Sequence, residues 1–156
     1  MLYKQKKLNL HTKKILFFFN NYRGIEVFKY LFLKKKIKSY DIVISKKHLN
    51  KKILKILKNL KVNFTITKTF KEKFVFQKIQ TADVSVVCGF PHIFNRKMIN
   101  LSKYGIINCH AGKLPEYRGG SPLNWQLINN ENKFGISVIK INTKIDAGDI
   151  IEEKKF

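Results

Sequence analysis

Short apolar runs alternate with segments of helical spacing along most of this chain. Residues 15–20 are a continuous apolar run of strand length, and residues 83–88 are a second, strongly β-branched run. Runs of this kind are typical of parallel strands that are buried on both faces. Between them, apolar residues recur at helical spacing in segments such as 25–36 and 53–60. The alternation predicts an α/β fold with a mostly parallel sheet and right-handed crossovers.

We expect about six to seven strands in a Rossmann-like, doubly wound sheet with helices on both faces. The expected strands are residues 15–20, 41–45, 62–66, 83–88, 104–108, 134–141 and 148–153. The expected helices are residues 25–36, 53–60, 70–79, 94–101 and 121–129. Ser121 suits the N-cap of the last helix and Pro122 its first helical position. Trp125, on the same helix, is expected to pack in the core.

The length of the chain bounds its organisation. With 156 residues it is long enough for one domain with a single sizeable core. Residues 1–12 form a basic, irregular leader that we expect to fray, so the domain is expected to span residues 13–156. A last strand begins near residue 150 and the sequence ends at Phe156. We therefore expect the domain to be truncated at its C-terminus.

The net charge of +22 has two interpretations. A strongly basic protein is typical of nucleic-acid or acidic-membrane partners. Here, however, only three of the 32 basic residues are arginine, and the lysines are spread along a chain that is also rich in Ile, Asn and Phe. AT-rich codons encode all four of these residue types, so a compositional bias explains the charge. We favour this second interpretation, which leaves lysine-rich helix faces in solvent without a polyanionic partner.

The cysteines and the apolar segments indicate a cytoplasmic protein. Cys88 and Cys109 show no CxxC or metal-type spacing and are expected to be buried, reduced thiols. No convincing secretory signal precedes residue 20, and no apolar run approaches the length of a membrane span.

Polar side chains gather where the expected strand 104–108 ends. Asn108 and His110 lie there, and Asp146 follows His110 by 36 residues. In an open α/β sheet, ligands bind beyond the carboxyl ends of the strands. Residues i and i+2 of an extended chain face the same side, so Asn108 and His110 would share a crevice while Cys109 points away. A carboxylate beside an imidazole favours its protonated form, which makes Asp146 the expected partner of His110.

The sequence around these residues carries three motifs. They are N-x-H at 108–110, L-P-x-Y-R-G at 114–119 and D-x-G-D at 146–149. Each motif alone has a structural explanation, because such polar residues often satisfy local hydrogen bonds or close turns. Together, at this spacing, they resemble the catalytic core of the folate-dependent formyltransferases. The specific match covers residues 89–150, and the preceding segment fits the family by its alternation of strands and helices.

The resemblance implies transfer of a formyl group from 10-formyltetrahydrofolate to an amine. The reaction passes through a tetrahedral intermediate with an oxyanion, which needs a hydrogen-bond donor and a group that handles protons. Asn108 would stabilise the oxyanion, His110 would do acid/base or electrostatic work, and Asp146 would orient His110 and help to move a proton. Neither a covalent enzyme intermediate nor a metal is expected, since the other histidines lack metal-ligand spacing.

The resemblance also implies two binding regions. The folate is expected between loop 88–94 and segment 142–146, in contact with Gly89, Phe90, Pro91, Asn142 and Ile145. Tyr117, Arg118 and Gly119 would hold an anionic group of the acceptor, because arginine forks onto phosphate. An ion pair of Arg118 with Glu116 or Asp149 is the alternative for that side chain.

Three branches of the family differ in the amine that they formylate. Glycinamide ribonucleotide formyltransferase fits least, because residues 20–24 lack its Gly- and Ser-rich phosphate cradle. The C-H-A-G-K-L-P sequence at 109–115 resembles the sugar-nucleotide branch, so an amino-sugar nucleotide is the acceptor that we favour. Charged initiator methionyl-tRNA is the alternative, and a truncated, non-catalytic relative that binds folate or a nucleotide is a third. A dinucleotide-binding domain is disfavoured, since no GxGxxG follows the first expected strand.

Overall fold

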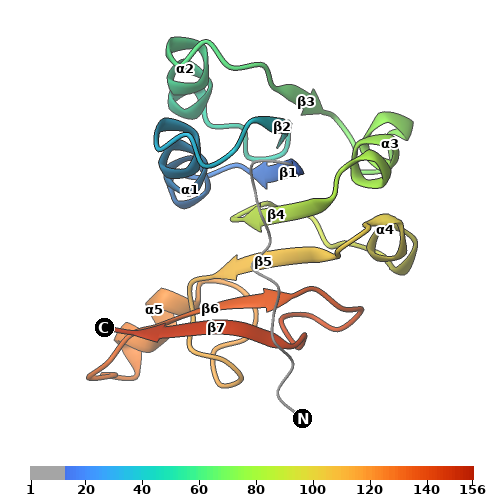
Figure 1. The fold of residues 1–156 in the computed structure, drawn as a ribbon. Coiled ribbons are helices and arrows are strands. Elements are labelled where there is room, and N and C mark those ends of the chain that lie inside the picture. The colour runs from blue at the N-terminus through green and yellow to red at the C-terminus, as the bar shows by residue number, and fades with distance from the viewer. Residues whose placement is uncertain (1–12) are drawn as a thin grey trace.

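The computed structural model describes residues 13–156, which form one sheet covered by helices (Figure 1). The strands are β1 Lys14–Phe19, β2 Ser39–Ser45, β3 Thr65–Thr67, β4 Val84–Cys88, β5 Ile106–His110, β6 Gly135–Lys140 and β7 Ile150–Lys155. The helices are α1 Tyr22–Leu33, α2 Lys51–Asn59, α3 Lys73–Thr81, α4 Arg96–Leu101 and α5 Pro122–Ile128. The leader that we expected at residues 1–12 lies outside the described residues.

The sheet has the Rossmann-like, mostly parallel character that the sequence predicts. Its seven strands lie in the order β3-β2-β1-β4-β5-β6-β7. Neighbours from β3 to β5 pair in parallel, whereas β6 is antiparallel to β5 and β7 is antiparallel to β6. The carboxyl ends of the five parallel strands therefore meet at one edge of the sheet, where α/β folds bind their ligands.

The core has two halves, one on each face of the sheet. Alternate residues of β1 point to opposite faces. Phe17 packs edge-on against Phe28 of α1, with ring centroids 5.3 Å apart. Phe18 faces the other way and packs against Phe94, with centroids 5.2 Å apart. Helices α1 and α2 cover the first face, and α3 and α4 cover the second (Figure 1).

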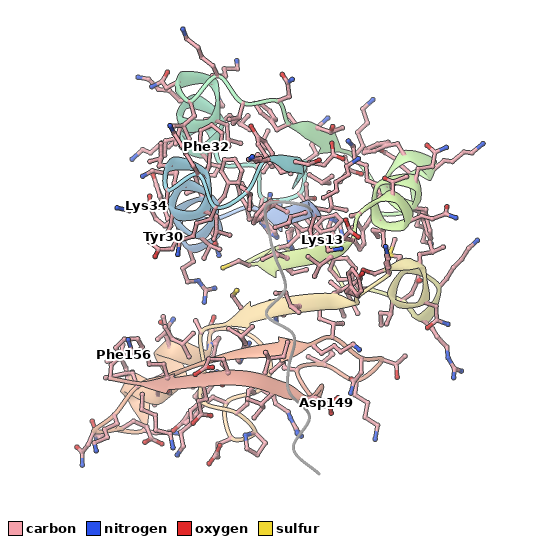
Figure 2. All side chains as sticks on the ribbon, in the orientation of Figure 1. Lys13, Tyr30, Phe32, Lys34, Asp149 and Phe156 are labelled. Atoms are coloured by element: carbon pink, nitrogen blue, oxygen red, sulfur yellow. The ribbon has the colours of Figure 1, made fainter. Side chains whose placement is uncertain are left out.

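Helix α1 shows how one side of a helix is buried and the other is left in solvent. Tyr30 and Phe32 both project from it (Figure 2). Phe32 stacks on Phe28 at 5.5 Å, whereas Tyr30 is 55% exposed and lies under the ammonium group of Lys36. Gly24 lets this helix approach the sheet closely, since a Cβ there would lie 2.1 Å from the Cβ of Phe19.

Helix α5 differs from the prediction in two respects. Trp125 is not in the core: its side chain is 55% exposed, because α5 turns Pro122 and Gln126, one helical turn apart, toward the sheet. Ser121 occupies the N-cap position but its side chain makes no capping hydrogen bond. Its backbone is left-handed, with φ of 53°, whereas side-chain capping needs an extended residue.

Helix α3 begins later than residue 70, where the sequence pattern places its start. The carboxylate of Glu72 accepts hydrogen bonds from the backbone N–H groups of Lys68 and Thr69. This closes a turn before the helix and leaves Phe70 buried in the turn.

Within residues 13–156, no helix combines the length and the apolar character needed to cross a bilayer.

Candidate active site

Strand β5 places Asn108 and His110 on one face of the sheet, as the i and i+2 spacing predicts. Ile106, on this same face, packs with the α3–α4 half of the core. Cys109 packs against the other half, under α1 and α2. The alternation of the strand therefore turns the amide and the imidazole into one crevice and the thiol away from it.

The carboxylate of Asp146 connects three segments of the chain. Its Oδ1 accepts a hydrogen bond from Asn108 Nδ2 at 3.2 Å, and its Oδ2 accepts one from the backbone N–H of Gly119 at 3.0 Å. His110 Nδ1 lies 3.6 Å from the same Oδ2. Asp146 has a left-handed backbone, with φ of 45°, which Asp adopts more readily than most residues. The expected pairing of His110 with Asp146 is present in the structure.

The imidazole of His110 is buried, and one of its nitrogens is hydrogen-bonded to the backbone. Nε2 lies 2.6 Å from the carbonyl oxygen of Tyr117. A carbonyl oxygen only accepts hydrogen bonds, so Nε2 carries a proton and donates it. Nδ1 then faces the Asp146 carboxylate, and protonation there would complete an ion pair. The ring is thereby oriented with Nδ1 beside a carboxylate.

The loop from residue 111 to residue 120 is tied to the sheet by two buried polar side chains. Ser137 Oγ of β6 donates to the carbonyl oxygen of Gly112 at 2.8 Å. Gln126 Oε1 of α5 accepts from the N–H of Gly135 at 2.7 Å, and its Nε2 donates to Ala111. Both side chains have no exposed surface. They fix the loop that supplies the Tyr117 carbonyl and the Gly119 N–H to the site.

A cleft of about 460 Å³ opens over these groups. It lies between the loop that follows β4 and the turn between β6 and β7, where the sequence predicts folate binding. The predicted site residues that line it are Gly89, Phe90, Pro91, Asn108, His110, Gly119, Asn142, Ile145 and Asp146. The three segments that carry these residues are thus brought together around one space.

Tyr117 and Arg118 do not line this cleft. The hydroxyl group of Tyr117 donates to Glu131 at 2.6 Å and accepts from Asn129 at 3.1 Å. The bond to Glu131 raises the pKa of Tyr117. Arg118 Nε donates to the backbone carbonyl of Asp146 at 3.1 Å and makes no ion pair with Glu116 or Asp149 within the described residues. Binding of the acceptor by these two side chains stays a prediction.

Arg23 and His92 are among the residues that line the cleft but were not named as site residues from the sequence. Arg23 reaches it from the first turn of α1. His92 reaches it from the loop after β4, where its Nε2 is hydrogen-bonded to Ser45 Oγ at 2.7 Å. Burial, together with the charge of Lys47, lowers the pKa of His92. Its position two residues after Phe90, inside a predicted binding loop, is a signal that could have identified it.

The two thiols lie together at the ends of β4 and β5. Cys88 and Cys109 are free. The pKa of Cys109 is lowered, first by its hydrogen bond with Cys88 and also by the charge of Arg23. The pKa of Cys88 is raised by that same hydrogen bond and by burial. Cys88 is buried as expected, and Cys109 is half-buried.

Comparison with known proteins gives the chain a family. A family model described as formyl transferase matches residues 33–156. The methionyl-tRNA formyltransferase of Fusobacterium nucleatum is 36% identical over 88 residues, which are 55% of this chain and 28% of that protein. The methionyl-tRNA formyltransferase of Citrifermentans bemidjiense is 42% identical over 69 residues, 44% of this chain and 22% of that protein. The matched segments thus span less than a third of these relatives.

Solved structures show the same architecture. A 4-N formyltransferase from Francisella tularensis is 26% identical with a TM-score of 0.73, over 94% of this chain and 57% of that one. A phosphoribosylglycinamide formyltransferase from Bacillus halodurans, at 17% identity and a TM-score of 0.76, matches 92% of this chain and 79% of that one. The second likeness concerns the fold alone. With the family model matched over residues 33–156, the chain belongs to the formyl transferase family.

Proposed function

We propose that this chain carries the catalytic site of a transferase that moves a formyl group from 10-formyltetrahydrofolate to a primary amine. The observation that carries the proposal is the convergence of Asn108, His110 and Asp146 on one cleft. These side chains come from β5 and from the turn between β6 and β7, and they are joined through a single carboxylate. Membership of the formyl transferase family supplies the reaction class.

The amide of Asn108 has the hydrogen-bonding capacity that the transition state requires. One hydrogen of Nδ2 is donated to Asp146, and the second is free to point into the cleft. As the amine nitrogen bonds to the formyl carbon, the carbonyl electron pair moves onto oxygen, and this hydrogen stabilises the oxyanion. Loss of one such donor typically costs about 10²–10³-fold in turnover. The oxyanion then collapses, and the bond between the formyl carbon and the nitrogen of the folate breaks.

His110 and Asp146 handle the proton that the attacking amine must lose. His110 Nδ1 is the ring nitrogen not used by the backbone, and it lies beside Asp146 Oδ2. A proton taken up at Nδ1 would lie beside this carboxylate and could pass to the departing nitrogen of the folate. The N–H of Gly119 keeps the carboxylate in place while the imidazole changes charge.

The walls of the cleft suit a flat, partly apolar ring system. Phe90, Pro91 and Ile145 supply apolar surface, and Asn142 adds a polar side chain to the lining. Few polar groups placed among apolar walls are typical of small-molecule sites. We therefore propose that the ring system of the formyl donor lies between loop 88–94 and segment 142–146.

Two acceptors have separate support. The relatives from Fusobacterium nucleatum and Citrifermentans bemidjiense are both methionyl-tRNA formyltransferases, which supports the amino group of methionyl-tRNA. An amino-sugar nucleotide is supported by the sequence of the 109–115 loop. We place methionyl-tRNA first, because the relatives that carry this name are 36% and 42% identical over the matched segments.

The test is formyl transfer from 10-formyltetrahydrofolate to each acceptor, run with the native chain and with His110→Ala. We expect turnover with one acceptor, its loss in the variant, and unchanged binding of the folate. Full activity of His110→Ala would refute the proposed mechanism. Folate binding without transfer to either acceptor would indicate a binding protein that does not catalyse the reaction.

A further inference from the structure

The ends of β4 and β5 bring the only two cysteines of the sequence together. The parallel register of these strands pairs Val87 with Asn108. The next position along both strands sets Cys88 beside Cys109. Adjacent strands lie about 4.8 Å apart, so the two side chains start within reach of one another.

Both cysteine side chains point to the same face of the sheet. Cys88 follows Val86 by two positions, and Cys109 follows Ile107 by two, so each pair shares a face. Val86 and Ile107 pack in the half of the core under α1 and α2, and Cys109 packs there as well. The register and the alternation of the strands therefore place two free thiols side by side.

The two thiols differ in their access to solvent. Cys109 is half-buried and lines the candidate active-site cleft together with Arg23. Cys88, in contrast, is only 4% exposed. A small oxidant that enters the cleft beside Arg23 therefore meets Cys109 before it meets Cys88.

The charges and hydrogen bonds at this position favour a thiolate on Cys109. Its pKa is lowered, first by the hydrogen bond with Cys88 and also by the charge of Arg23. The same hydrogen bond, together with burial, raises the pKa of Cys88. Arg23 belongs to the first turn of α1, which packs on the end of β4: a Cβ at Gly24 would lie 2.6 Å from the carbonyl oxygen of Cys88. The thiolate is the nucleophilic form of cysteine, so Cys109 is the attacking sulfur and Cys88 retains its proton.

We propose that Cys88 and Cys109 form a redox-active dithiol that hydrogen peroxide converts into an intramolecular disulfide. The Cys109 thiolate attacks one peroxide oxygen: an S–O bond forms, the O–O bond breaks, and the hydroxide that leaves takes the proton of Cys88. The sulfur of Cys88 then attacks Cys109 Sγ, so that the S–S bond forms and the S–O bond breaks. The second hydroxide takes up the proton that Cys109 lost on ionisation. The two sulfurs lose two electrons, and the peroxide is reduced to two waters.

The disulfide also acts on the candidate active site. A disulfide holds its two Cβ atoms about 3.5–4.5 Å apart, so the ends of β4 and β5 must approach by about 0.5 Å. Asn108 and His110 flank Cys109 on β5 and move with it. Displacement of a catalytic group by 1 Å can cost about 10²-fold in rate, so the oxidised chain should transfer formyl groups at about one tenth of the rate. This effect on catalysis rests on the proposed function, whereas the thiol chemistry does not.

The test is peptide mapping of the full chain, with free thiols blocked by N-ethylmaleimide, before and after treatment with hydrogen peroxide. Trypsin cleaves between the two cysteines and on both sides of them, after Lys78, Arg96, Lys103 and Lys113. Cys88 therefore falls on peptide 79–96 and Cys109 on peptide 104–113. We expect peroxide to join these two peptides within a protein of monomer mass, and dithiothreitol to separate them and restore the rate of formyl transfer.

Single variants assign the two roles. Cys88→Ser should leave Cys109 as a sulfenic acid that dimedone traps, because the second sulfur is missing. Cys109→Ser should leave Cys88 reduced at the peroxide concentration that crosslinks the native chain. Arg23→Gln should slow formation of the disulfide by about three- to ten-fold, because a nearby cation favours the thiolate. Lys34→Gln, the same change of charge at the exposed other end of α1 (Figure 2), should leave the rate unchanged.

The outcomes separate this inference from the proposed function. Absence of the crosslink in the native chain, or a crosslink only between two chains, would overturn the inference alone. A crosslinked chain that transfers formyl groups at the full rate would overturn the effect on catalysis. Absence of transfer in both redox states, with the crosslink formed, would overturn the proposed function and support the dithiol.

Discussion

The replacement Gly112→Ala tests whether the loop after β5 holds the His110 ring. A Cβ at position 112 would lie 2.8 Å from His110 Nε2 and 2.8 Å from the carbonyl oxygen of Tyr117. It would also lie 2.6 Å from Pro122 Cβ. His110 Nε2 and the Tyr117 carbonyl oxygen are the two atoms of the hydrogen bond that fixes the ring. The methyl group therefore cannot be accommodated unless the ring or the loop moves.

The expected magnitude follows from these contacts. Overpacking of a tight site costs about 1–3 kcal/mol, and the loss of the Nε2 hydrogen bond adds about 1 kcal/mol. We expect the free energy of unfolding to fall by about 2–4 kcal/mol. Displacement of a catalytic group by 1 Å can cost about 10²-fold in rate, so formyl transfer should fall by about that factor.

Gly120→Ala is the matched control, in the same loop and with the same added methyl group. No heavy atom lies within 4 Å of the Cβ position at Gly120, so its stability should change by less than about 0.5 kcal/mol. Urea unfolding gives the stability of both variants, and ¹⁵N NMR of the His110 ring reports the tautomer. Equal stability and an unchanged Nε2-protonated ring in both variants would refute the reasoning, whether or not the chain catalyses transfer.

The remaining predictions concern stability. The hydroxyl group of Ser85 is buried and has no hydrogen-bond partner within the described residues, so Ser85→Ala should leave the unfolding free energy unchanged or raise it by about 1 kcal/mol. Ser137→Ala, which removes two hydrogen bonds to the loop, should lower it by about 1–3 kcal/mol, and equal urea midpoints for the two serine variants would contradict this. Burial and the charge of Lys47 lower the pKa of His92 in the folded chain. Between this lowered pKa and the ordinary histidine pKa of about 6.5, the unfolded chain binds more protons than the folded chain. The free energy of unfolding should therefore decrease as the pH falls from about 6.5 through the lowered pKa. His92→Gln should flatten this pH dependence in urea unfolding at pH 5.5 and 7.5, and an unchanged slope would count against it. Trp125→Gln should change stability by less than about 0.5 kcal/mol because the ring is 55% exposed, while Phe28→Ala should cost about 3–5 kcal/mol in the same denaturation assay.

The strands were predictable because their sequences carry a strong pattern. Residues 15–19 of β1 are all apolar, and the structure buries them on both faces, with Phe17 and Phe18 in opposite halves of the core. Helix ends were less predictable, because they depend on side chains that bind the backbone. The start of α3 is set by the hydrogen bonds of Glu72 to Lys68 and Thr69, and no periodicity of apolar residues reports these.

The orientation of α5 shows a second limit of predicting burial from the positions of apolar residues. Trp125 and Leu127 are apolar and lie on a short helix, so their character alone predicts burial. The structure instead buries Gln126, whose amide bonds to Ala111 and to Gly135. A short helix next to a loop is oriented by the loop's need for polar partners, since unpaired backbone groups in the interior are costly. Composition does not reveal which polar residue will satisfy that need.

The geometry of the candidate site was predictable from the sequence only in part. Asn108 and His110 are placed by the alternation of one strand, so their common orientation follows from spacing alone. Asp146 comes from a turn 36 residues later, and its reach depends on a left-handed backbone and on Gly148, where a Cβ would lie 1.6 Å from the carbonyl oxygen of Lys140. The turn can fold so tightly only because residue 148 has no side chain. The glycine of the D-x-G-D motif thus serves the carboxylate two residues before it, by allowing the turn that carries Asp146 to close against β6.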